Sequence, residues 1–167
     1  MAGAEPPASE VLVAFHIIDG ERCEARDGER LAVVSPSDGA VFASIPRGRE
    51  GDVDAAVRAA RAAFATGPWP GLSATERGRL LTALGRAVEA QAEPLAALES
   101  RDTGKPISQG RADMVALARY FEFYGGAADK LTGETIPIAT GYTAVTLREP
   151  LGVVASIVPW NYPAQIL

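Results

Sequence analysis

The feature that most constrains this sequence is a continuous apolar run near its carboxyl end. Residues 152–158 read Gly-Val-Val-Ala-Ser-Ile-Val without apolar–polar alternation, and Pro159 ends the run. Such a run is typical of a strand buried on both faces, which usually belongs to a parallel sheet. Parallel neighbours need crossovers of a dozen or more residues. Only residues 159–167 follow, with Tyr162-Pro163 opening a predicted crossover helix, so we expect a piece of a longer protein.

The first third of the chain is predicted to be rich in short strands and turns. Residues 1–14 read as a loose leader. Asp19-Gly20 and Asp27-Gly28 are signals for hairpin turns. Residues 35–39 (Ser-Pro-Ser-Asp-Gly) predict a further turn before a strand over 40–45.

Four helices are predicted next. Over residues 52–64 the apolar positions recur three and four apart, and Asp52 is a candidate N-cap. The second helix is predicted to begin at a capping box of Ser73 and Glu76. The third has Pro94 in its first turn and ends at Gly104. The fourth is a series of spaced apolar residues from Met114 to Leu131 and ends at Gly133. From residue 134 the period becomes alternating around Thr140-Gly141, which predicts a hairpin over 134–149.

Composition excludes several classes of function. The net charge is −5 and no run of Lys or Arg occurs, which argues against a nucleic-acid partner because phosphate binding needs clustered cations. No apolar stretch is long enough to span a membrane and no signal-peptide pattern is present. The single Cys23 cannot form an internal disulfide, and we expect a cytoplasmic location.

Few residues carry a recognisable chemistry. The chain has no G-x-G-x-x-G, Walker A or G-x-S-x-G motif, and His16 and Cys23 are interpreted as structural. Asn161 follows the predicted buried strand, where open α/β sheets place their ligands. Its amide could donate to an oxygen that gains negative charge, although the local pattern alone favours an N-cap of the following helix.

Several ordered motifs bear on this choice. Residues 150–163, PLGVVASIVPWNYP, resemble the signature segment of the NAD(P)-dependent aldehyde dehydrogenase superfamily. The resemblance extends upstream through four further groups of residues: 102–106 (DTGKP), 128–137, 52–64, and the first-strand segments 18–21 and 35–39.

The resemblance implies a role for each matching position. Asn161 would hold the carbonyl oxygen of an aldehyde as it becomes an oxyanion, and Tyr162 would wall the substrate tunnel. The hairpin 134–149 would be the oligomerisation arm, and Asp102 would border a monovalent cation site. The segment that lines the nicotinamide cofactor, NAD or NADP, would comprise Ile157, Val158, Pro159 and Trp160.

The implied fold class is α/β, an incomplete N-terminal part of the aldehyde dehydrogenase fold with the start of a Rossmann-like parallel sheet. Residues 15–133 would supply strands and helices of the cofactor-binding domain, and 150–167 its first buried strand and the start of the crossover helix.

The implied full-length parent is a homo-oligomer, a dimer or tetramer. It oxidises a small-molecule aldehyde to a carboxylic acid through a cysteine thiohemiacetal. Cys23 matches neither the nucleophile nor the base of that family, so the chain alone is predicted to be inactive. The alternatives are a truncated non-catalytic partner of full-length relatives and, ranked last, an independent helical binding domain.

Overall fold

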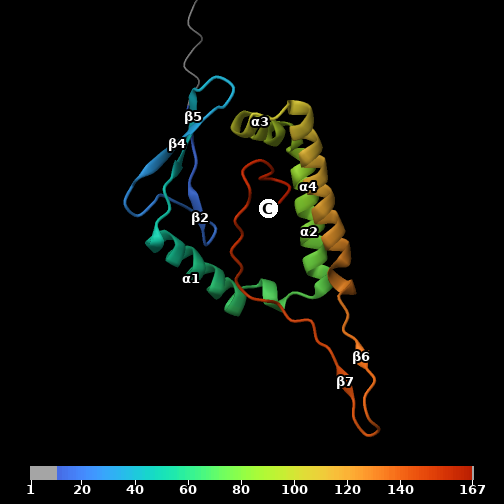
Figure 1. Cartoon of the computed structure of the whole chain (residues 1–167). Helices are drawn as coiled ribbons and strands as arrows, with labels where there is room; N and C mark the ends of the chain where they lie inside the picture. Colours follow the sequence, from blue (N-terminus) through green and yellow to red (C-terminus); the bar gives the residue numbers. More distant parts are fainter. Residues whose placement is uncertain (1–10, 167) are drawn as a thin grey trace, which may run out of the picture.

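The computed structural model describes residues 11–166, in which a strand-rich side faces a set of packed helices (Figure 1). The strands are β1 (Leu12–Val13), β2 (His16–Ile18), β3 (Glu21–Cys23), β4 (Arg30–Val34), β5 (Val41–Pro46), β6 (Thr135–Ile136) and β7 (Ala144–Val145). The helices are α1 (Glu50–Thr66), η1 (Trp69–Gly71), α2 (Ala74–Ala90), α3 (Ala92–Thr103), α4 (Ile107–Ala127) and η2 (Ala128–Lys130).

The strand-rich side is built from a small mixed sheet and a hairpin. The sheet has the order β1-β5-β4, with β1 parallel and β4 antiparallel to β5. Leu12 and Val13 therefore belong to a strand rather than to a loose leader, because they pair with Ala43 and Ser44. The rest of the predicted leader, residues 1–10, lies outside the described residues.

Two of the three predicted turns are confirmed, and the third is a turn but not the predicted hairpin. The Asp19-Gly20 hairpin is confirmed: it joins β2 to β3, and φ of 55° and 78° at the two residues suits a type I′ turn. Residues 35–39 turn between the paired strands β4 and β5, as predicted. Asp27-Gly28 also forms a turn, but not a hairpin, because β3 and β4 belong to different sheets.

Helix α1 begins earlier than predicted. Its N-cap is Arg49, and Asp52 lies in the first turn instead of capping the helix itself. The Asp52 carboxylate accepts hydrogen bonds from two backbone N–H groups, that of Arg49 at 2.9 Å and that of Arg26 at 3.0 Å. Asp52 therefore ties the start of α1 to the loop before β4.

This arrangement predicts a pH-dependent contribution to stability. The hydrogen bond from the Arg49 N–H lowers the pKa of Asp52; burial opposes it, and the Arg26 N–H reinforces it. A lowered folded-state pKa stabilises the fold above the ordinary value of 3.8, and this contribution disappears as the pH falls through the lowered pKa.

Asp52→Asn leaves only one acceptor for the two N–H groups. We therefore expect the variant to have a lower Tm than the wild type at about pH 7, and this gap to close as the pH falls through the lowered pKa of Asp52. Circular dichroism melting curves of both proteins across this range measure the gap. A gap of constant size contradicts the assignment.

The ends of the later helices follow partly from local signals. The capping box is confirmed: the Glu76 N–H donates to Ser73 Oγ at 3.3 Å, and the Ser73 N–H donates to Glu76 Oε2 at 2.8 Å. Gly104 closes α3 at a φ of 78°, as predicted. The limits predicted for α4 are wrong, because it begins at Ile107 and ends at Ala127, before Gly133.

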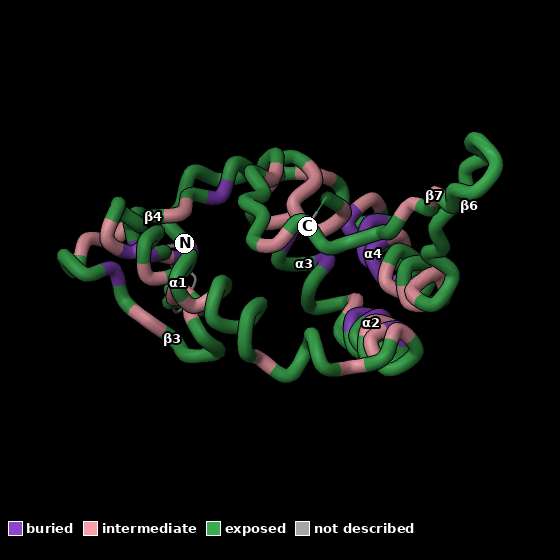
Figure 2. Tube along the Cα trace, turned by 90° about the horizontal axis from the view of Figure 1, so that it is seen from below, coloured by how far each residue is buried: buried purple, intermediate pink, exposed green. Residues whose placement is uncertain are grey.

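The core lies where α2, α4 and the C-terminal turn meet. Val88, Leu117 and Ala118 form a buried cluster, and Phe121 and Ala164 pack against it. Figure 2 shows this burial along the facing sides of α2 and α4. The cluster packs Ala164 of the C-terminal segment against the two helices.

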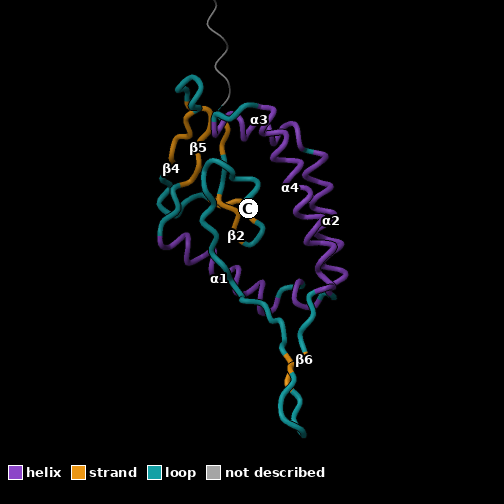
Figure 3. Tube along the Cα trace, turned by 45° about the vertical axis from the view of Figure 1, so that its right-hand side comes forward, coloured by secondary structure: helices purple, strands orange, loops and turns teal. Residues whose placement is uncertain are grey.

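The structure overturns the prediction of a buried strand over 152–158. The segment is an extended loop (Figure 3), and no described strand pairs with it. Ile157 is 98% exposed and Val154 is 69% exposed. A β-strand requires the hydrogen bonds of a neighbour, and residues 11–166 supply none here.

The helix predicted to start at Tyr162-Pro163 is also absent. Residues 162–166 form a turn in which the Ile166 N–H donates to the Tyr162 carbonyl at 3.3 Å. A helix requires consecutive bonds of this spacing, and among the described residues of this segment there is one.

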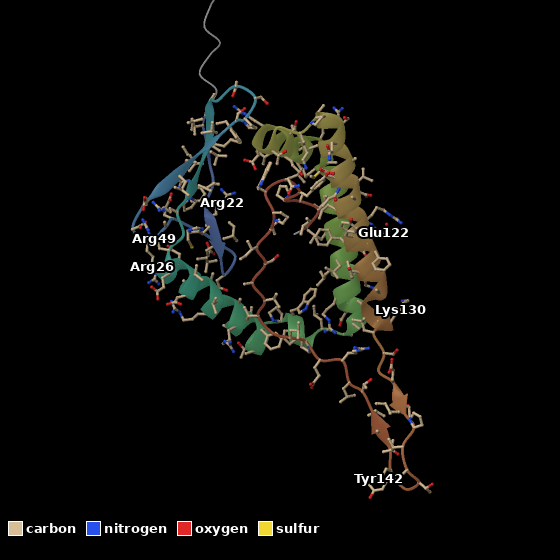
Figure 4. The ribbon with its side chains drawn as sticks, viewed as in Figure 1. Arg22, Arg26, Arg49, Glu122, Lys130 and Tyr142 are labelled. Atoms are coloured by element: carbon tan, nitrogen blue, oxygen red, sulfur yellow. The ribbon has the colours of Figure 1, made fainter. Side chains whose placement is uncertain are left out.

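The hairpin prediction for 134–149 is confirmed. β6 and β7 are antiparallel, with Thr135 opposite Val145 and Ile136 opposite Ala144. The hairpin projects from the helices, with Tyr142 at its tip (Figure 4). No helix within residues 11–166 has the length and apolar character needed to cross a membrane.

Candidate functional site

A pocket of about 330 Å³ lies where the C-terminal segment meets the loop between α3 and α4. Residues 103–106 and Gln109 line one side, and residues 160–162 line the other. The pocket therefore combines the DTGKP motif with the Trp-Asn-Tyr motif, which lie far apart in the sequence. Asn161 is exposed in its wall.

Gly104 makes the sharp reversal between α3 and α4 possible. Its φ of 78° suits glycine, and a Cβ there would lie 2.9 Å from Pro36 Cγ. Two hydrogen bonds hold the Lys105 backbone. Its N–H donates to Thr103 Oγ1 at 3.3 Å, and its carbonyl accepts from Ser100 Oγ at 2.6 Å. The reversal directs Lys105 back toward both helices.

Lys105 forms the centre of a buried charged triad with Glu99 of α3 and Asp113 of α4. Its Nζ donates to Glu99 Oε1 and, at 2.6 Å, to Asp113 Oδ2. The three side chains are 8%, 4% and 3% exposed, in the order Lys105, Glu99, Asp113. Burial acts to lower the pKa of Lys105, but the hydrogen bonds to Asp113 and Glu99 prevail and raise it.

The triad contacts the segment that carries Asn161. Lys105 Nζ lies 4.4 Å from the centre of the Tyr162 ring, within the range of a cation–π interaction. Gln109 Nε2 donates to the Tyr162 hydroxyl at 2.7 Å, and Gln165 Nε2 donates to Asp113 Oδ1 at 2.7 Å. Side chains of α4 and its preceding loop thus fix residues 162–165.

The other site residues predicted from the sequence lie along the same segment. Ile157 is 98% exposed, Trp160 is 76% exposed, Pro159 is exposed and Val158 is partly buried. Because no helix follows Asn161 in the structure, the interpretation of Asn161 as an N-cap is wrong.

Asp102 is not brought to this pocket. It is exposed and borders a separate, apolar cavity of about 500 Å³ between the sheet, α3 and residues 163–164. Among residues 11–166 no group of three or more His, Cys, Asp or Glu side chains could hold a metal ion. A cation role for Asp102 stays a prediction.

His16 and Cys23 lie in the first hairpin. They face each other across β2 and β3, and neither lines the pocket at Asn161. Cys23 is a free thiol.

Neither the triad nor the two glutamines were predicted from the sequence. One signal was available, because acidic residues occur within apolar helical spacing. Glu99 follows Ala96 by three positions and Asp113 precedes Leu117 by four, and both apolar residues are buried. A carboxylate on an apolar face indicates a buried partner, since an unpaired buried charge is strongly unfavourable.

Comparisons with known proteins cover most of the chain. Residues 23–167 match the Aldehyde dehydrogenase family. The chain is 41% identical over 158 residues to aldehyde dehydrogenase family 2 member B4, mitochondrial, of Arabidopsis thaliana, covering 94% of this chain and 29% of the relative. It is 43% identical over 148 residues to aldehyde dehydrogenase NAD(P)+ 2 of Saccharomyces cerevisiae, covering 87% and 29%.

The structural comparison agrees. The crystal structure of an NAD-dependent aldehyde dehydrogenase from Sinorhizobium meliloti matches with a TM-score of 0.90 and 37% identity, covering 98% of this chain and 33% of that one. The chain thus spans about a third of the length of the proteins it matches. Its fold is an N-terminal portion of the α/β fold of these enzymes, and the chain belongs to the aldehyde dehydrogenase family.

Proposed function

We propose that this chain supplies the oxyanion donor and part of the cofactor-binding surface of an enzyme that oxidises an aldehyde to a carboxylic acid. The observation that carries the proposal is the placement of Asn161, whose side chain is exposed in a pocket wall while residues 162–165 are fixed beside it. A fixed amide can donate to the substrate carbonyl oxygen as negative charge develops on it.

Residues 157–160 suit a flat apolar group. Ile157 and Trp160 are largely exposed, and such apolar surface favours a partner that removes it from water. The nicotinamide ring of NAD or NADP is such a partner, and when bound it accepts a hydride from the substrate. None of the four side chains is a cation that could recognise a 2′-phosphate, so we propose either NAD or NADP as the cofactor.

The chain of residues 1–167 is expected to show no dehydrogenase turnover. Its single thiol, Cys23, lies in β3, where Sγ contacts the Glu21 carbonyl at 3.7 Å, and it does not line the pocket at Asn161. The family reaction needs a thiolate beside the oxyanion donor. The absorbance of NAD(P)H formed with an aldehyde measures turnover. Turnover that Asn161→Ala abolishes would contradict this expectation.

The 134–149 hairpin supports a second candidate function, a non-catalytic partner that docks on full-length relatives. Its apolar side chains are exposed, with Leu147 at 79% and Tyr142 at 75%. We propose that the same hairpin joins copies of the full-length protein as a homo-oligomer. The coding sequence after Leu167 separates the two functions: a continuing frame supports the enzyme, and a stop codon supports the partner.

We propose that the protein acts in the cytoplasm, although the Arabidopsis relative carries the description mitochondrial. Fluorescence imaging of the tagged protein tests the location.

A further inference from the structure

The buried triad is more elaborate than a bridge between α3 and α4 requires. Lys105 is shared by two carboxylates, Glu99 and Asp113, so the group carries a formal charge of about −1 in a buried place. Glu99 Oε2 is buried with no hydrogen-bond partner among the described residues. Buried ion pairs contribute little net stability, because desolvation offsets their attraction. Stability alone therefore explains the triad poorly.

The triad also contacts the turn that follows Asn161. Lys105 lies against the ring of Tyr162, and Asp113 accepts from Gln165 with the carboxylate oxygen that Lys105 does not use. Gln109, in the first turn of α4, holds the Tyr162 hydroxyl. Three ties thus converge on residues 162–165, and Asn161 is the next residue toward the N-terminus.

The segment before Asn161 is held far less. Residues 153–157 are all exposed, and among the described residues none of the hydrogen bonds that cross between distant parts of the chain involves them. The direction of the Asn161 amide therefore depends on the side that follows it. A rotation of the backbone at 161–162 would break the contacts of Tyr162.

We propose that Lys105 is a positioning residue, whose buried ammonium, held by Glu99 and Asp113, fixes the turn 161–165 and so directs the Asn161 amide into the pocket. The inference rests on the proposed function of Asn161 for its catalytic consequence. The fixing of the turn itself is independent of that function.

Hydrogen–deuterium exchange of the 167-residue chain tests the fixing. Gln165→Leu removes one tie and leaves the triad intact. We expect the Ile166 amide, which donates to the Tyr162 carbonyl and so reports on the turn, to exchange about tenfold faster, as after loss of a charge-assisted hydrogen bond. Lys105→Met is expected to accelerate exchange of the Ile166 amide further.

The control is Arg111→Met, which breaks an exposed ion pair between α3 and α4 with Glu93. It is expected to leave exchange of the Ile166 amide unchanged. Unchanged exchange in Gln165→Leu overturns the proposal even if Lys105→Met fails to fold.

Kinetics of the full-length enzyme test the consequence. Gln165→Leu is expected to lower kcat about tenfold with little change in KM, because it disturbs a group that acts in the transition state. In an Asn161→Ala background the same change is expected to have no further effect on kcat. Additive losses overturn positioning through Asn161. Full activity of Asn161→Ala alone refutes the proposed function, while the exchange result still stands.

Discussion

Asn161→Ala is expected to lower kcat of the full-length enzyme by about a hundred- to a thousandfold, the range found when one oxyanion donor is removed. The side chain is exposed in the wall of the 330 Å³ pocket, so its truncation leaves no cavity in a core. KM for the aldehyde is expected to change little, because the interaction strengthens only as the carbonyl oxygen gains charge. Steady-state kinetics with saturating cofactor measure both constants.

A matched substitution separates donation from shape. Asn161→Asp keeps the size of the side chain but replaces the N–H donor with a negative charge, so we expect a loss of kcat at least as large as that of Asn161→Ala. Wild-type kcat in the Asn161→Asp enzyme would show that the amide fills space only. Equal melting temperatures of the three proteins exclude a loss through unfolding.

Elements with local signals were predictable. The Ser73–Glu76 capping box and the positive φ at Gly20 and Gly104 follow from residues within one turn of each other. Their geometry depends on little else, because a cap or a tight turn satisfies its own backbone groups.

Elements that depend on distant partners were not predictable in the same way. The run 152–158 has the composition of a buried strand, yet it is extended and exposed, since no described neighbour supplies hydrogen bonds to it. The early start of α4 was missed because its first residues pack through Gly110, where a Cβ would lie 2.9 Å from the Ala96 carbonyl oxygen. Such a close approach leaves no apolar periodicity in the sequence.

The candidate site divides in the same manner. Asn161 and residues 157–160 were predicted because a contiguous motif carries them. The Lys105 triad was not, because Glu99, Lys105 and Asp113 meet only after Gly104 reverses the chain between α3 and α4. The groups that hold Tyr162 and Gln165 in place thus come from the three-dimensional packing, whereas Asn161, the proposed oxyanion donor, was predicted from a contiguous motif.

The second large effect is expected at the crossing of α2 and α4. Gly78 of α2 and Gly125 of α4 bring the two backbones together: a Cβ at 78 would lie 2.4 Å from the Gly125 carbonyl oxygen, and a Cβ at 125 would lie 2.7 Å from that of Gly78. A backbone oxygen cannot move aside as a flexible side chain can. Gly78→Ala is therefore expected to destabilise the fold by about 2 to 3 kcal/mol, the cost of overpacking a dense interior.

Gly126→Ala is the matched control. It places the same methyl group on α4, one residue from Gly125, where a Cβ would meet nothing within 4 Å. Alanine exceeds glycine in helix propensity, so this variant is expected to gain about 0.5 to 1 kcal/mol. Urea unfolding at equal m-values compares the variants. Both changes replace glycine with alanine inside a helix, so the gain in helix propensity is the same for each. Opposite signs of the two changes in unfolding free energy would therefore isolate the contact between the helices. A stabilised Gly78→Ala protein would show that α2 and α4 do not approach this closely.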